Sequence, residues 1–193
     1  MLKELRPAVV MVVGMTLLTG LVYPLAVTGV AQAVFPHQAH GSLVEINGQI
    51  VGSSLIGQNF TKPDYFQSRP SAAGNDGYDA SSSLGSNWGS TNQKLIDRVK
   101  ASVDKFHKDN PEYSEPIPAD LVTASSSGLD PHISPASAEA QAPRIAKTRG
   151  IAVDQVLRLI TEHTEARTLG VLGEPRVNVL ELNLDLDRQF PHK

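Results

Sequence analysis

The chain has 193 residues, of which 40% are hydrophobic, and its formal net charge is only -3. Because the charges are dispersed and form no basic stripe, the sequence lacks the electrostatic signature of a nucleic-acid-binding protein. It contains no cysteine, which excludes disulfides and cysteine metal sites, so ordinary packing must hold any exported domain together.

The most apolar part of the chain is residues 7–35, which contain no charged side chain. A bilayer core needs about 20 apolar residues of helix, so this segment predicts one transmembrane helix. The alternative is a cleavable signal peptide, because Ala31-Gln32-Ala33 has the small-x-small form of a cleavage site. The apolar run is about twice the length of a signal core, which favours an uncleaved anchor and leaves open whether Ala33 is ever a cleavage site.

The charges around the apolar segment predict its orientation. Lys3 and Arg6 precede it, and the next lysine or arginine is Lys62. The positive-inside rule therefore places residues 1–6 in the cytoplasm and residues 36–193 on the extracytoplasmic side of the plasma membrane. The exported part is long enough for one domain with its own core.

Three residues of the apolar segment predict contacts with other membrane helices. Pro24 removes a backbone donor and is expected to kink the helix. Thr16 and Gly20 form a small-xxx-small pair, which allows a close helix approach. The simpler alternative is a passive lipid anchor.

The exported part begins with a predicted hairpin and a long loop. Residues 42–46 and 49–56 flank Asn47-Gly48, a dipeptide typical of a two-residue hairpin turn. Residues 57–91 are dense in Gly, Ser, Asn, Asp and Pro, which predicts little regular structure. This loop also carries aromatic residues that argue against full disorder: Phe60, Tyr65, Phe66, Tyr78 and Trp88.

Apolar periodicity predicts helices after this loop. Residues 92–107 place five apolar side chains on one face, with Thr91 as the expected N-cap. Ser134 is expected to cap a further helix with Pro135 at its first position. Pro143 is expected to end that helix and start another, which Gly150 would terminate.

The last elements are a helix and a strand. Residues 153–164 are amphipathic, and residues 176–182 are the best strand candidate because they contain Val177, Val179, Leu180 and Leu182. The predicted fold is therefore a compact α+β domain with a small, mainly antiparallel sheet behind one transmembrane helix.

The most catalytic-looking segment is residues 125–132, where serines, Asp130 and His132 occur together. A serine hydrolase is the corresponding hypothesis, since a nucleophile needs a base and an orienting group. The sequence has no G-x-S-x-G elbow, and we favour a turn in which Asp130 and Ser134 cap the next helix. Glu174 and Arg176 are expected either to pair or to orient a turn. No phosphate-binding loop or strong metal-ligand spacing occurs in the sequence, so neither a catalytic site nor a metal site is predicted.

Five ordered blocks resemble the C-subunit family of the Kdp potassium-transporting ATPases, which are bacterial and archaeal P-type pumps. The blocks are residues 52–58, 65–72, 85–92, 120–134 and 173–187. Ser126 stands where the family usually has Gly, and Trp88 and Ser90 replace a Leu and a Pro. These departures affect local turns only.

The resemblance implies a non-catalytic subunit that stabilises the pump. Its expected partners are the channel-like potassium-binding subunit, the ATP-hydrolysing subunit, a small single-helix subunit and membrane lipid. A role as a catalytic chaperone that raises ATP affinity, with direct ATP contact, is suggested for the family. Our hypothesis is that any effect on ATP use is indirect, because the orientation separates residues 36–193 from cytoplasmic ATP.

The long loop also supplies a candidate partner interface, formed by Tyr65, Phe66, Arg69, Asn87 and Trp88. Aromatic side chains and arginine are common anchors of protein interfaces. The alternative is that the aromatic residues fasten the loop to the domain's own core. A free-standing anchored adaptor domain is the remaining alternative to the pump subunit.

Overall fold

The computed structural model describes residues 2–191 and divides the chain into two compact units, Met1–Val51 and Gly52–Lys193. The first unit contains the apolar helix, which runs through α1 (Leu2–Leu17), a π-helical turn (Leu18–Val22) and α2 (Tyr23–Val34). The segment Lys3–Val34 has 32 residues and is long and apolar enough, by length and composition, to cross a membrane. The short helix α3 (Pro36–Ala39) and strand β1 (Leu43–Ile46) follow.

The π-helical turn lies directly before Pro24. Tyr23 donates its backbone N–H to the carbonyl of Leu18, one residue further back than in an α-helix. A wider turn of this kind is one way in which a helix accommodates a proline that cannot donate. Thr19 also donates its hydroxyl to the Met15 carbonyl at 2.7 Å. A π-helical turn thus precedes Pro24, while the kink expected there stays a prediction.

The predicted hairpin is confirmed. Strand β1 pairs with β2 (Gln49–Ser53). Asn47 and Gly48 between them both have positive φ, at 53° and 77°, as the two central residues of a type I′ turn require.

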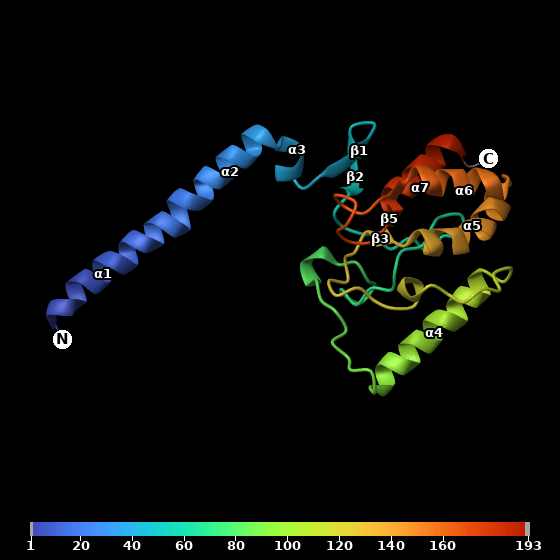
Figure 1. Cartoon of the computed structure of the whole chain (residues 1–193), viewed down its shortest axis with the longest axis horizontal. Helices are drawn as coiled ribbons and strands as arrows, with labels where there is room; N and C mark the ends of the chain where they lie inside the picture. Colours follow the sequence, from blue (N-terminus) through green and yellow to red (C-terminus); the bar gives the residue numbers. More distant parts are fainter. Residues whose placement is uncertain (1, 192–193) are drawn as a thin grey trace. The chain divides into compact units, whose positions relative to one another are not determined.

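The second unit has helices packed around a three-stranded antiparallel sheet (Figure 1). The strand order is β3-β5-β4, with Ile133 and Thr164 both opposite Val177. In chain order the elements are a 3-10 turn (Ala80–Ser82), α4 (Gln93–Asp109), a second 3-10 turn (Ala119–Leu121), β3 (His132–Ile133), α5 (Pro135–Arg149), α6 (Val153–Glu162), β4 (Thr164–Glu165), β5 (Arg176–Asn178) and α7 (Val179–Gln189). The α+β class is confirmed.

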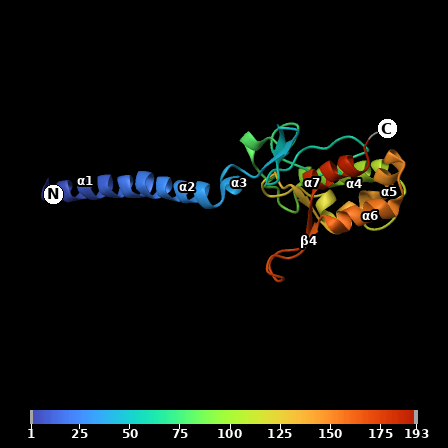
Figure 2. The same ribbon diagram turned by 90° about the horizontal axis from the view of Figure 1, so that it is seen from above.

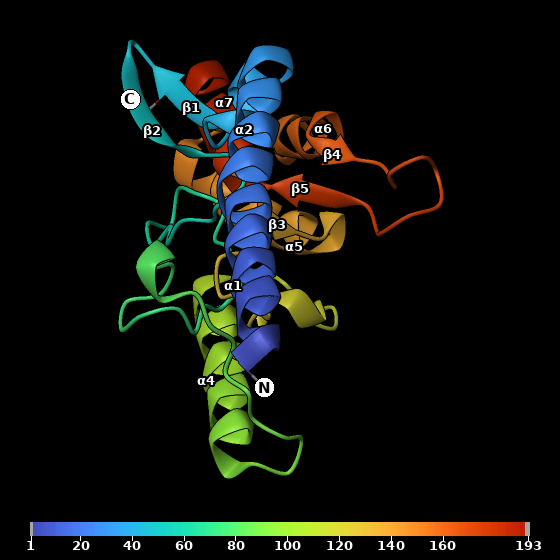
Figure 3. The ribbon, with the colours of Figure 1, turned by 90° about the vertical axis from the view of Figure 1, so that its left-hand side faces the viewer.

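Two apolar clusters hold this unit together. The larger one joins the loop residue Phe66 to β3, α5, α6, β5 and α7, and the smaller one contains Phe106, Leu121 and Ala140. Helix α4 lies apart from α6 and α7, with α5 between them (Figure 1 and Figure 3). Only Phe106 of α4 is fully buried, so the predicted apolar face of this helix is only partly covered.

The predicted closing strand at residues 176–182 is wrong beyond Asn178. The strand ends there, and the Asn178 side chain accepts hydrogen bonds from the backbone N–H groups of Leu180 and Glu181, which makes it the N-cap of α7. Val179, Leu182 and Leu186 are buried at helical spacing. The alternation of Val177 and Val179 suggested a strand. The segment instead forms a helix because Asn178 caps it and its apolar residues recur at helical spacing.

Two further boundaries differ from prediction. Pro143 does not break α5, which continues to Arg149, while Gly150 ends it with φ 67° as expected. Burial of Ala142 and Ile145 beside Pro143 offsets the cost of an interior proline, about 3 kcal/mol. The N-cap of α4 is Asn92, whose side chain accepts the Lys94 N–H, and not Thr91.

Candidate partner interface

Residues 57–91 contain little regular structure, as predicted, but they are fastened to the core. The Phe66 side chain is 0% exposed within the main apolar cluster. Its backbone N–H and carbonyl both bind the buried side chain of Asn183, at 2.8 and 2.9 Å. The Gln141 side chain likewise accepts the backbone N–H of the next residue, Gln67, at 2.8 Å and donates to its carbonyl at 3.1 Å.

Tyr65 also binds the domain itself. Its hydroxyl donates to Asp187 at 2.7 Å, and Arg149 lies over its ring at 5.0 Å while pairing with the same carboxylate. Burial and the hydrogen bond to Asp187 raise the pKa of Tyr65. Tyr65 and Phe66 therefore fasten the loop to the domain's own core, as the alternative interpretation predicts. Because its side chain is buried, Phe66 is not part of the candidate interface.

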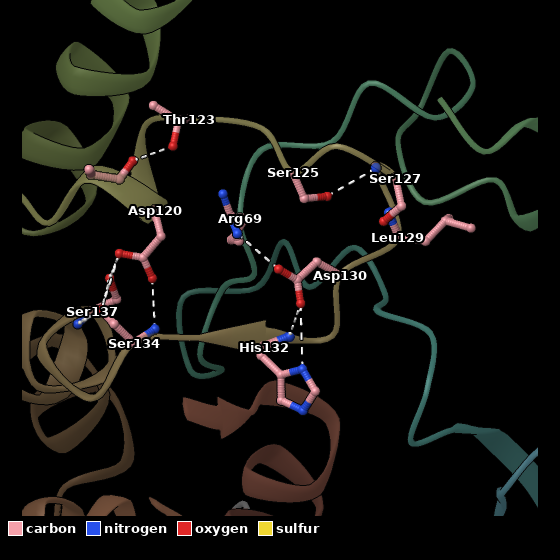
Figure 4. A network of polar contacts seen from close by, with 12 residues as sticks. Arg69, Asp120, Thr123, Ser125, Ser127, Leu129, Asp130, His132, Ser134 and Ser137 are labelled. Carbon is pink, nitrogen blue, oxygen red and sulfur yellow. Dashed lines mark hydrogen bonds and ion pairs between the residues drawn. The ribbon is translucent and has the colours of Figure 1, made fainter. Parts of the chain in front are cut away.

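Arg69 lies at the centre of a different arrangement, shown in Figure 4. Its guanidinium donates to Asp130 at 2.9 Å, and Asp130 also accepts the His132 backbone N–H at 3.0 Å. Burial alone would raise the pKa of Asp130, but the hydrogen bonds from His132 and the Arg69 charge outweigh it and hold this pKa below its usual value. The Arg69 Nε atom is buried without a partner among the described residues.

The serines near Asp130 accept backbone hydrogen bonds within a turn. Ser125 accepts the Gly128 N–H at 2.9 Å, and Ser127 accepts the Leu129 N–H at 3.1 Å. The His132 imidazole points away from both serines (Figure 4). Within residues 2–191 no hydrogen bond joins a serine hydroxyl of this turn to His132, so this geometry does not support the hydrolase hypothesis.

Helix capping beside this turn involves Ser134 and Asp120. Ser134 caps α5 as predicted, by accepting the Ser137 N–H at 3.1 Å. Asp130 does not cap the helix. Instead Asp120 accepts the Ser134 N–H at 2.7 Å and the Ser137 hydroxyl at 2.6 Å, which fixes the second 3-10 turn to α5.

The serine turn touches the long loop through glycine. Gly128 has φ 69°, and a Cβ at this position would lie 2.8 Å from the Ala73 nitrogen and the Leu84 carbonyl oxygen. Ser71 donates its hydroxyl to the Gly128 carbonyl at 2.6 Å. Residues 71–84 and 125–130 are therefore held together at backbone contact distance.

An open hollow of about 710 Å³ lies where these segments meet. Its lining combines the Arg69–Asp130 pair, the serine turn and the exposed side chains of Leu55 and Ile56, of which Leu55 is 62% exposed. Apolar side chains beside a partly exposed ion pair are typical of a surface that binds another protein. The sequence predicted Arg69 but missed Leu55, Ile56 and Asp130, because no periodic pattern connects these distant segments.

Asn87 and Trp88 lie elsewhere on the same loop. Asn87 is exposed with φ 52°, and Trp88 is 36% exposed with Arg98 stacked 4.9 Å from its ring centre. Neither residue lines the hollow beside Arg69. The five predicted interface residues thus lie in three places. Tyr65 and Phe66 attach the loop to the core, and Arg69 lines the hollow. Asn87 and Trp88 lie near α4.

Residues 5–188 match the family model described as KdpC: K+-transporting ATPase, c chain. A protein of Koribacter versatilis named Potassium-transporting ATPase KdpC subunit is 56% identical over 192 residues, which cover 99% of this chain and 97% of the relative. A relative of the same name from Rhodospirillum rubrum is 56% identical over 191 residues, covering 99% of this chain and 98% of its own. One from Sorangium cellulosum is 56% identical over 187 residues, covering 97% of this chain and 98% of its own.

Proposed function

Because the chain belongs to the KdpC family of K+-transporting ATPase subunits, we propose that it is a non-catalytic subunit that stabilises assembly of the pump. Its partners are the potassium-binding channel-like subunit, the ATP-hydrolysing subunit and the small single-helix subunit. The apolar helix Lys3–Val34 anchors it in the plasma membrane, and Thr16, Gly20 and Pro24 contact neighbouring membrane helices.

The extracytoplasmic location of residues 36–193 is supported by the charge distribution. Lys3 and Arg6 lie on one side of the apolar helix, and no lysine or arginine follows it before Lys62. The folded unit then contacts the outer parts of the partner subunits and has no direct access to cytoplasmic ATP. Its effect on ATP use, including any catalytic-chaperone effect, is coupled through the complex.

The observation that carries this proposal is the hollow at the Arg69–Asp130 pair. Leu55 and Ile56 expose apolar surface there, while the loops behind them are fixed by Gly128 and by the Arg69–Asp130 hydrogen bond. A prearranged surface binds with a smaller loss of conformational entropy than a mobile one. Asn87 and Trp88 provide a second contact on the same loop.

The test is copurification of the tagged full-length chain with the other subunits in detergent, followed by mass spectrometry. We expect a stoichiometric P-type ATPase subunit and a large potassium-binding membrane protein. Recovery of a folded chain alone would contradict the proposal and support a free-standing adaptor. Leu55→Asp should reduce recovery at least tenfold, whereas Leu157→Asp, at an exposed position of α6 outside the hollow, should not.

ATP binding needs a separate measurement. The purified full-length chain should show no saturable binding at micromolar ATP, while the assembled pump should respond to its removal through a raised KM for ATP. Saturable binding by the chain alone, abolished by specific substitutions, would overturn the indirect coupling.

A further inference from the structure

The loop between β4 and β5 exposes its apolar side chains. Leu169 is 86% exposed, Val171 72% and Leu172 58%. Every residue from Glu165 to Pro175 is exposed. The loop projects away from the helices of its unit in two perpendicular views (Figure 2 and Figure 3).

Hydrogen bonds and ion pairs within the loop define its conformation. Thr168 and Leu172 exchange two backbone hydrogen bonds, both at 2.9 Å, and Gly170 donates to the Arg167 carbonyl at 3.0 Å. Ion pairs between Arg167 and Glu174 and between Arg176 and Glu165, both at 2.7 Å, close its base. Backbone hydrogen bonds within the loop thus define its turn, while the apolar side chains face solvent.

Leu169 is held in an unfavourable conformation. Its φ is 54°, in the left-handed region that is unfavourable for a residue other than glycine. The strain directs a large apolar side chain outward, although burial would be the favourable alternative. Strained, exposed apolar residues of this kind are characteristic of a contact that a partner completes.

The chemistry of the loop favours a protein partner over lipid. Residues 168–173 contain neither Trp, Tyr, Lys nor Arg, the residues that anchor segments at a bilayer surface. The two arginines at the base are paired with glutamates, so no free positive charge remains there for anionic lipid headgroups. Gly170 and Gly173 have open space around their Cα atoms, which lets a partner approach the backbone.

We infer that the tip of this loop, Leu169, Val171 and Leu172, inserts into an apolar pocket on another subunit of the same ATPase. The inference rests on the proposed function, since it requires the assembled pump. The three side chains fill the pocket, and the neutral ion pairs at the base form its polar rim.

The absence of cysteine from the chain permits a clean experiment. Val171→Cys is labelled with a thiol-reactive benzophenone in the full-length chain and assembled with the other subunits before irradiation. We expect a cross-link to one partner subunit. Val153→Cys, which is 41% exposed on α6, is the matched control and should give at least tenfold less product.

The alternatives give distinct products. Labelling of lipid would assign the tip to the membrane, and a cross-link between two copies of this chain would assign it to self-association. Either result, or a yield equal to the Val153→Cys control, would overturn the inference while leaving the proposed function intact. Failure of the unmodified chain to recover any subunit would overturn both.

A second measurement does not depend on a label. The double variant Leu169→Ser with Leu172→Ser should reduce copurification of the partner subunits at least tenfold. Its circular dichroism spectrum and its unfolding midpoint should equal those of the unmodified chain, since these side chains are exposed. Unchanged copurification would contradict the inference.

Discussion

Residues 57–91 and residues 166–175 both contain little regular structure, yet they treat their apolar side chains in opposite ways. The long loop buries Phe66 at 0% exposure in the core and fixes its backbone through Asn183. The short loop forms backbone hydrogen bonds within itself and leaves Leu169 at 86% exposure. Lack of regular structure therefore indicates nothing by itself about whether a loop serves packing or recognition.

The comparison teaches that backbone hydrogen bonding and side-chain burial are separable. In the long loop the two go together, because the side chains of Asn183 and Gln141 that bind the loop backbone are themselves buried. In the short loop the hydrogen bonds are local, so its apolar side chains contribute little to the stability of the isolated chain. Substitutions in the two loops should therefore affect different measurements.

Phe66→Ala should have the largest effect on stability. Removal of a fully buried phenylalanine leaves a cavity and costs about 3–5 kcal/mol. The measurement is chemical denaturation of the detergent-solubilised chain followed by circular dichroism. A loss below about 1 kcal/mol would show that the long loop is not part of the core.

Gly128→Ala should come next, at about 3 kcal/mol. The positive φ and the 2.8 Å approach of Ala73 and Leu84 both oppose a Cβ here. Gly170→Ala is the matched control, because it has φ 77° but open space around it, and we expect a cost of about 1 kcal/mol. If both variants lost the same free energy of unfolding, the contact between the two loops would contribute nothing to stability.

Asp130→Asn should destabilise the chain by about 1 kcal/mol at pH 7, since the Asp130 carboxylate accepts charge-assisted hydrogen bonds. The pKa of Asp130 is lowered in the folded chain from its ordinary value of 3.8. Its contribution is therefore present above that value and is lost as the pH falls through the folded pKa. The unfolding midpoints of the two chains should converge once the pH falls below this lowered pKa, and a difference that persists there would exclude this origin.

Leu169→Ser should have the smallest effect on stability, within about 0.5 kcal/mol, because the side chain is exposed. The same change should nevertheless weaken copurification with the partner subunits. A loss of stability similar to that of Phe66→Ala would remove the contrast between the two loops.

Local sequence predicted several elements correctly because their signals are local. The apolar helix, the Asn47-Gly48 hairpin, the Ser134 cap and the Gly150 terminus each depend on residues within a few positions. The ordered blocks also identified the family, which the full-length matches confirm.

The candidate site was predicted less well. Arg69 was identified, but its pair Asp130 lies 61 positions away and the exposed Leu55 and Ile56 belong to another segment. Charge and hydropathy along the sequence do not indicate which loops lie close together in the folded chain. The exposed tip at Leu169 was missed for a different reason, since an apolar residue in a sequence is expected to be buried.

By itself, then, the sequence determined the long apolar helix, the hairpin, the α+β class and the family. Only tertiary structure decided that Phe66 is buried, that α5 continues through Pro143 and that the chain forms α7 after Asn178. For α5 and α7 the local signals conflicted, and packing of Ala142, Ile145, Leu182 and Leu186 in one core decided between them. Phe66 is buried in the same core because the buried side chain of Asn183 binds its backbone.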